Sequence, residues 1–135
     1  MRLLAVDFGS KRIGIAVGVD DPVICTAKPP LTPSGKLATD AQSISKLARD
    51  LEVDCVLLGI PINEEDDRMA RICRKLGDEI RKLDVEVVEI DERLSSVEAE
   101  KVLLGDDLTA AKRKKLIDGE AARILLERYF ESAKA

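Results

Sequence analysis

Three carboxylates at separate points of the chain have the type and setting to do chemistry together. Asp7 ends the apolar run 3–6, which carries no other charge, and a glycine follows two positions later. A buried strand presents an acid in this way at its end, where a metal or a phosphate can reach it. Glu92 lies just past the end of a second predicted strand, where open α/β sheets place their sites. Asp118 lies near the start of the last predicted helix.

Three converging acids in a chain without histidine favour metal-dependent phosphodiester chemistry. Mg²⁺ and Mn²⁺ prefer oxygen ligands. Two such ions about 4 Å apart can activate a water and stabilise the leaving oxygen of a phosphodiester, so no histidine is needed. The absence of histidine also excludes a Cys/His zinc site and a Ser-His-Asp triad.

Each acid also has an alternative interpretation. The alternative for Asp7 is a turn-capping role, and for Asp118 it is a favourable interaction with the helix macrodipole. Asp91 competes with Glu92, because alternation along a strand sends one of them toward the site and the other away, and we prefer Glu92. An unpaired acid is costly on a helix face that packs on a sheet. Asp118 shares such a predicted face with Ala121, Ala122, Leu125 and Tyr129.

Candidate phosphate contacts surround the first acid and recur near the last helix. Gly9 and Gly14 would let the backbone approach a phosphate without a Cβ in the way, and Arg93 could bind phosphate oxygens bidentately. The formal net charge of −4 alone argues against nucleic-acid binding, although bound divalent ions would offset the acids. The basic cluster 112–115 either binds phosphate or is a solvated surface. The cationic and polar candidates are Ser10, Lys11, Arg12, Lys112, Arg113, Lys114 and Lys115.

The elements that position these residues follow from hydrophobic periodicity. Strands are predicted at 3–7, 13–17, 23–27, 53–60 and 85–90, with the third ended by Pro29 and Pro30. The first two strands suit an antiparallel hairpin, and the continuous apolar run 53–60 indicates burial on both faces. Helices are predicted at 37–51, 68–83 and 116–129, and Ser95 with Glu98 forms a capping box for another. This pattern predicts an α/β fold with a mixed sheet and flanking helices.

Length and composition indicate one domain over residues 1–135, with an aliphatic core because aromatic residues make up only 2%. The three cysteines form no CxxC motif and are expected to be free thiols in a reducing compartment. No apolar stretch approaches the roughly 18 residues of a membrane helix, and no signal-peptide pattern precedes the first strand. We therefore expect a cytoplasmic protein with no membrane partner.

Taken in order, four segments resemble the YqgF family, also called RuvX. They are 7–16 (DFGSKRIGIA), 58–63 (LGIPIN), 91–99 (DERLSSVEA) and 117–126 (IDGEAARILL). The resemblance implies an RNase H-like fold with a five-stranded mixed sheet, three leading antiparallel strands and flanking helices. It implies a nuclease that trims the 5′ end of precursor 16S rRNA, related to RuvC-type Holliday-junction resolvases. Carried over, Asp7, Glu92 and Asp118 are the metal-binding catalytic acids.

The chain departs from the family pattern after Asn63, the last residue of the second segment and a candidate nucleic-acid contact. The family continues with a less acidic loop that contains glycine, whereas this chain has four acids at 64–67. These acids either repel phosphate and alter substrate affinity, or face solvent and cap the following helix. We favour the capping interpretation.

The sequence leaves three functions open. The first is a Mg²⁺- or Mn²⁺-dependent endonuclease that acts on structured precursor rRNA. The second is a nuclease that resolves DNA junctions, which the same three acids would serve. The third is a non-catalytic module that binds RNA or the transcription machinery. The oligomeric state, monomer or homodimer, is also left open.

Overall fold

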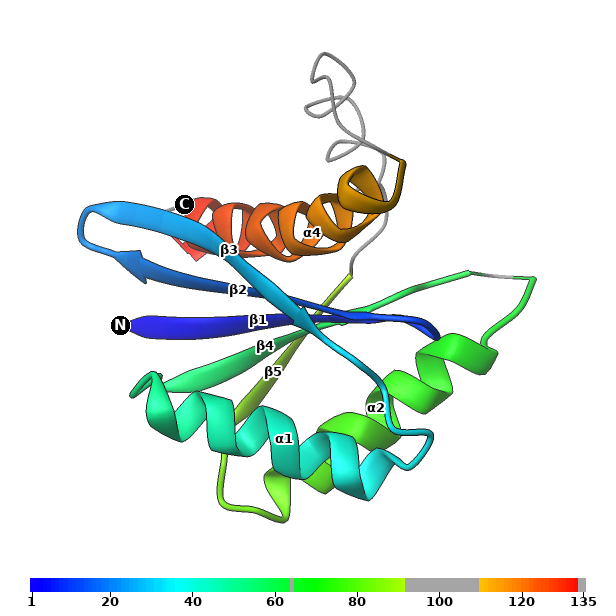
Figure 1. The fold of residues 1–135 in the computed structure, drawn as a ribbon. Coiled ribbons are helices and arrows are strands. Elements are labelled where there is room, and N and C mark those ends of the chain that lie inside the picture. The colour runs from blue at the N-terminus through cyan, green and yellow to red at the C-terminus, as the bar shows by residue number, and fades with distance from the viewer. Residues whose placement is uncertain (64, 92–109, 134–135) are drawn as a thin grey trace.

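The computed structural model describes residues 1–63, 65–91 and 110–133, with only the backbone described for 110–118. The described strands form one five-stranded sheet in the order β3-β2-β1-β4-β5 (Figure 1). The strands are β1 (Arg2–Phe8), β2 (Ile13–Asp20), β3 (Val23–Leu31), β4 (Cys55–Ile60) and β5 (Val87–Asp91), and the helices are α1 (Leu37–Asp50), α2 (Arg68–Arg81) and α4 (Ala110–Ala133).

The sheet is mixed, as the sequence predicted. β1 and β2 form an antiparallel hairpin in which Arg2 pairs with Val19 and Phe8 with Ile13. β3 extends this antiparallel unit on the far side of β2, whereas β4 and β5 run parallel to β1 and to each other. The carboxyl ends of β1, β4 and β5 therefore meet at the same edge of the sheet.

Helices cover both faces of the sheet (Figure 1). α1 and α2 pack on one face through a core cluster that includes Ile44 and Leu76, and we call this the α1–α2 face. α4 packs on the other face through Ala122, Leu125 and Leu126, and we call this the α4 face. Each fully buried leucine of this kind contributes about 1.5–3 kcal/mol through removal of apolar surface from water.

The central strand β4 is buried along its whole length, which confirms the prediction from its continuous apolar run. Val56 and Leu58 belong to the cluster under α1 and α2, whereas Cys55 and Leu57 belong to the cluster under α4. Burial on both faces explains why this strand lacks the polar alternation of a half-exposed one.

The predicted end of the third strand was wrong. β3 does not stop at Pro29 and Pro30 but continues to Leu31. β3 is an edge strand, and proline within a sheet is found in such strands or at bulges. The register with β2 also shifts between Ile13 and Ile15, whose partners are Leu31 and Lys28, so both prolines lie in an irregular part of the ladder.

The predicted helices are present, with differences at their ends and on one face. Helical periodicity would place Ile72 with the other apolar residues of α2, but its side chain is 36% exposed, while Ala70 and Gly77 are buried. The last helix begins at residue 110 rather than 116 and extends to 133. The helix expected after Ser95 lies outside the described residues.

The three cysteines are free thiols, and Cys55 and Cys73 are buried. Burial raises the pKa of Cys55 to about 11, with a smaller contribution from the charge of Glu86. Among the described residues, no helix is both long enough and apolar enough to cross a membrane.

Candidate active site

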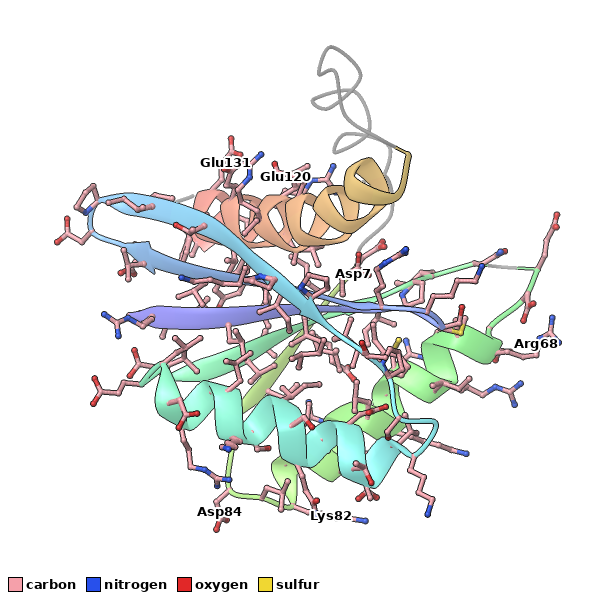
Figure 2. All side chains as sticks on the ribbon, in the orientation of Figure 1. Asp7, Arg68, Lys82, Asp84, Glu120 and Glu131 are labelled. Atoms are coloured by element: carbon pink, nitrogen blue, oxygen red, sulfur yellow. The ribbon has the colours of Figure 1, made fainter. Side chains whose placement is uncertain are left out.

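Asp7 lies near the carboxyl end of β1, on the α4 face of the sheet. Leu3 and Ala5 belong to the core cluster under α4, and Val6 belongs to the cluster on the opposite face. Side chains alternate along a strand, so Asp7 follows Leu3 and Ala5. Its side chain is half-buried. Figure 2 shows it at this end of the sheet, on the side that carries α4.

The residue opposite Asp7 in the hairpin is Gly14. The preceding pair on the same face is Ala5 and Ala16, both fully buried. Directly opposite residues hold their Cβ atoms about 4.5–5.5 Å apart, so a larger residue at Gly14 would stand beside the Asp7 carboxylate. A glycine there leaves that side of the carboxylate without a side chain.

The turn between β1 and β2 explains Gly9 in structural terms. The Gly9 N–H donates to the Arg12 carbonyl at 2.9 Å. A Cβ on Gly9 would stand 2.9 Å from that same oxygen, a distance at which the turn has to shift. Ser10 and Lys11 are exposed at its tip, and Arg12 is half-buried. The turn therefore places three candidate phosphate contacts beside the Asp7 end of the strand.

The first part of α4 approaches the sheet near the same end. A Cβ on Gly119 would lie 3.2 Å from the Ala27 Cβ and 3.9 Å from the Ile15 carbonyl oxygen. Ile15 is next to Gly14, the partner of Asp7. Farther along α4, Leu126 and Phe130 lie over Gly18. α4 therefore approaches the sheet closely at Gly119.

Asp118 directly precedes Gly119 in α4, and only its backbone is described. The helix face predicted to pack on the sheet does so, because Ala121, Ala122 and Leu125 are fully buried. The backbone of Asp118 is therefore adjacent to Gly119, which lies against β2 and β3. The cluster 112–115 is also in α4, with its side chains outside the description.

Asp91 lies on the other face of the sheet from Asp7. It is the last residue of β5 and pairs with Ile60, whose side chain belongs to the core under α1 and α2. Ile90, one residue earlier, packs in the cluster under α4. Strand alternation therefore directs Asp91 away from the face of Asp7. Glu92 and Arg93 lie outside the described residues.

The donor chemistry at Asp7 fits a divalent ion. A half-buried carboxylate at the end of a buried strand, with no side chain opposite, is an oxygen donor of the kind that Mg²⁺ and Mn²⁺ take. Over the part of the chain whose side chains are described, no group of three acids or cysteines could hold a metal. Glu92 and Asp118 are not among those side chains.

The acidic loop after Asn63 is organised by hydrogen bonds within itself. The Asn63 side-chain oxygen accepts the Glu65 N–H at 3.0 Å. Asp66 Oδ1 accepts the backbone N–H of Arg68, the first residue of α2, at 3.0 Å, and both Asp66 oxygens accept bonds from the Arg68 guanidinium. These bonds lower the pKa of Asp66 to about 2. The favoured interpretation is supported, with Asp66 as the residue that satisfies the start of the helix.

One acid that the sequence interpretation missed is Asp40, in the first turn of α1. Its side chain is 3% exposed, and its Oδ1 accepts the Ser34 N–H at 2.9 Å. The sequence contained a signal for its burial. Asp40 is three residues after Leu37 and four before Ile44, so it lies on the apolar face of the helix.

Comparison with known proteins identifies the family. The family model described as "RuvX: Holliday junction resolvase" matches residues 1–132. The chain belongs to this family. A RuvX relative from Endomicrobium trichonymphae, named "Putative pre-16S rRNA nuclease", is 36% identical over 96% of this chain and 95% of its own. One of the same name from Heliobacterium modesticaldum is 35% identical over 98% of this chain and 90% of its own.

Solved structures agree with the fold. RuvC from T. thermophilus, solved in complex with a Holliday junction substrate, superposes with a TM-score of 0.64 at 12% identity, over 100% of this chain and 98% of that one. The fowlpox virus resolvase, in complex with Holliday junction DNA, superposes with a TM-score of 0.62 at 16% identity, over 100% of both chains. The RNase H-like fold expected from the sequence is confirmed.

Proposed function

We propose that this RuvX-family chain is one nuclease domain, residues 1–135, that uses divalent metal to trim the 5′ end of precursor 16S rRNA in the cytoplasm. The observation that carries the proposal is the position of Asp7, a half-buried acid opposite Gly14 on the face that α4 covers. The names of the RuvX relatives supply the substrate class.

Asp7, Glu92 and Asp118 are the residues that would hold Mg²⁺ or Mn²⁺. Such an ion supplies activation of a water and stabilisation of the leaving oxygen. Asp7 would bring a carboxylate from β1, and Asp118 would bring one from the helix that Gly119 brings close to β2 and β3. Glu92 follows Asp91, which lies on the opposite face, so the alternation of β5 favours Glu92 as the third acid.

Phosphate contacts would come from the β1–β2 turn and from the basic groups near the other acids. Gly9, Ser10, Lys11 and Arg12 form the turn beside Asp7. Arg93, the cluster 112–115 and Asn63 complete the proposed set. The Asn63 side-chain oxygen is engaged by Glu65, so a nucleic-acid contact there would use its amide nitrogen. The active form is a monomer or a homodimer.

The second candidate is resolution of branched DNA. The family description and the two resolvases solved with Holliday junctions favour it, since the fold is the same. A resolvase has to cut two strands, which calls for two sites in a dimer. A strictly monomeric active species would therefore count against this candidate.

The test is cleavage of a labelled 5′ segment of precursor 16S rRNA, next to a DNA four-way junction, in Mn²⁺ or in EDTA. Wild type is compared with Asp118→Asn and with Glu131→Gln, an exposed acid on the same helix (Figure 2). We expect Mn²⁺-dependent RNA cutting that Asp118→Asn abolishes and Glu131→Gln retains. Junction cutting alone would favour the resolvase, and no cutting of either substrate would contradict both candidates.

A further inference from the structure

A pocket opens at the carboxyl end of β1, at the same end of the sheet as the proposed active site but on the opposite face. Its walls are mostly apolar and come from Phe8, Pro33, Leu37 and Ile72. Gly9 and Ser10 of the β1–β2 turn also line it. Phe8 belongs to the core under α1 and α2, so the pocket lies on the α1–α2 face, one residue away from the acid.

The pocket contains one buried charged side chain, Asp40 of α1. One of its oxygens accepts the Ser34 N–H at 2.9 Å, and the described part of the chain gives it no other hydrogen bond. A carboxylate offers about four lone-pair sites, so Asp40 has acceptor sites besides the one that Ser34 uses. A buried carboxylate is costly unless its acceptor sites are filled. Hydrogen-bond donors from a bound molecule would fill them.

The outer rim of the pocket carries three cationic side chains, of which Arg68 pairs with Asp66 at 2.7 Å. Ile72 lines both this pocket and an adjoining depression on α2 whose other walls are Arg68, Arg71 and Lys75. Arg71 makes a 3.4 Å ion pair with Asp67, and its side chain is 62% exposed. An apolar slot with an acceptor inside and cations outside complements a nucleotide, whose base offers N–H donors and whose backbone carries phosphates.

We propose that this pocket receives one unstacked nucleobase of the RNA substrate, with guanine preferred, and that Asp40 reads its Watson–Crick edge. The inference rests on the proposed nuclease function. Guanine presents the N1 and N2 donors side by side, which match two carboxylate acceptor sites; adenine, cytosine and uracil each present one donor group there. The apolar walls would hold the face of the base, while Arg71 and Lys75 contact the flanking phosphates.

The test measures the affinity of short uridine-rich RNAs with one central guanosine, inosine, adenosine or abasic site, by fluorescence anisotropy in EDTA. Binding without metal separates base recognition from catalysis. Asp40→Asn keeps an oxygen for the Ser34 N–H but removes the second acceptor. Its matched control is Asp50→Asn, an exposed acid at the end of the same helix. Ile72→Ala removes part of the pocket wall. Ile62→Ala is its control, because Ile62 is exposed to a similar degree (39% against 36%) and is not among the residues that line the pocket.

We expect wild type to bind the guanosine RNA about tenfold more tightly than the adenosine RNA, with inosine in between because it lacks the N2 donor. Asp40→Asn should lose this preference and Asp50→Asn should keep it. Ile72→Ala should weaken binding of the guanosine RNA more than binding of the abasic RNA. Ile62→Ala should not produce this difference. Equal affinity for every central base in wild type would overturn the base pocket and leave the nuclease proposal standing. No binding of any RNA would also overturn the base pocket, and the nuclease proposal would then depend on the cleavage test in Mn²⁺.

Discussion

Asp7 and Gly14 face each other across the β1–β2 ladder, on the side of the sheet that α4 covers. The acid and the residue beside it therefore come from two adjacent strands of one hairpin. The proposed site therefore depends on Gly14, a residue that has no side chain to take part in catalysis. A glycine at position 14 matters here because it places no side chain of its own beside the carboxylate.

Gly14→Leu should abolish metal-dependent cleavage, because its side chain would stand directly beside the Asp7 carboxylate. Overpacking a well-packed site costs about 1–3 kcal/mol, so the variant should still fold. The measurement is the cleavage rate together with the melting temperature in EDTA. A folded Gly14→Leu with wild-type activity would show that the space beside Asp7 is not used.

Metal should stabilise the wild-type fold. Three carboxylates close together repel one another, and a bound divalent ion relieves that repulsion. At a metal concentration of 100 times Kd, stabilisation is about 2.7 kcal/mol, which raises the melting temperature by several degrees. The measurement is thermal unfolding in EDTA and in millimolar Mn²⁺.

In the same experiment, Asp7→Asn should melt at or above the wild-type temperature in EDTA and gain little from Mn²⁺. Removal of one acid relieves repulsion and also removes a ligand. Asp20→Asn is the matched control, because Asp20 ends β2 at the opposite edge of the sheet and pairs with the N-terminal amine. An equal Mn²⁺ response in wild type and Asp7→Asn would contradict the proposed ligand.

Gly119→Ala should destabilise the protein relative to Gly77→Ala. Both changes gain about 1 kcal/mol of helix propensity. The new methyl at Gly119 would meet the Ala27 Cβ at 3.2 Å and the Lys28 carbonyl at 3.4 Å, which move only with the backbone of β3. At Gly77 the neighbour at 3.2 Å is the flexible end of Leu58. Denaturant unfolding measures the difference, and a Gly119→Ala at least as stable as Gly77→Ala would contradict the close approach of α4.

Asp66 should titrate near pH 2. Hydrogen bonds from Arg68, first from its side chain and then from its backbone N–H, lower the pKa of Asp66 from 3.8 to about 2. A lowered folded-state pKa means that this interaction stabilises the fold above the unfolded pKa and is lost as the pH falls toward 2. NMR titration of the Asp66 carboxyl measures it. Arg68→Gln should move the pKa back toward 3.8, and an unchanged value would contradict the pairing.

The three cysteines should differ in their rates of reaction with an alkylating reagent. Burial raises the pKa of Cys25 and also raises that of Cys55 to about 11, and Cys73 has no exposed surface. The thiolate is the reactive form, so all three should react slowly at neutral pH. Cys25, which is only half-buried, should react first. Mass spectrometry after alkylation in the folded state measures the order, and faster labelling of Cys55 would contradict the described packing.

Local periodicity predicted the sheet well, because buried strands and amphipathic helices each have a characteristic spacing of apolar residues. The uninterrupted run in β4 indicated burial on two faces, and the structure has it there. Tertiary context decided what periodicity could not. Pro29 and Pro30 are tolerated inside β3 because that strand is an edge, and strand order is a property of the whole sheet.

The candidate site was predictable where an acid broke an apolar pattern at the end of an element. Asp7 did so, and its face follows from strand alternation. Asp40 broke the stripe of α1 in the same way, but an acid in a first helical turn has an ordinary explanation in the helix macrodipole. Its burial and its place in a pocket depend on the loop at Ser34, which only the folded chain brings over it.

The most direct test of the central claim is the Mn²⁺-dependent cleavage rate of the precursor 16S rRNA segment by Asp7→Asn and Asp91→Asn. The two changes remove similar acids from the carboxyl ends of β1 and β5, two parallel strands of one sheet, and the two side chains lie on opposite faces. We predict that Asp7→Asn lowers the rate at least a hundredfold, the scale of losing one stabilising group in a catalytic site. Asp91→Asn should stay within a few-fold of wild type. Equal loss in both variants, or an active Asp7→Asn, would contradict a metal site on the α4 face.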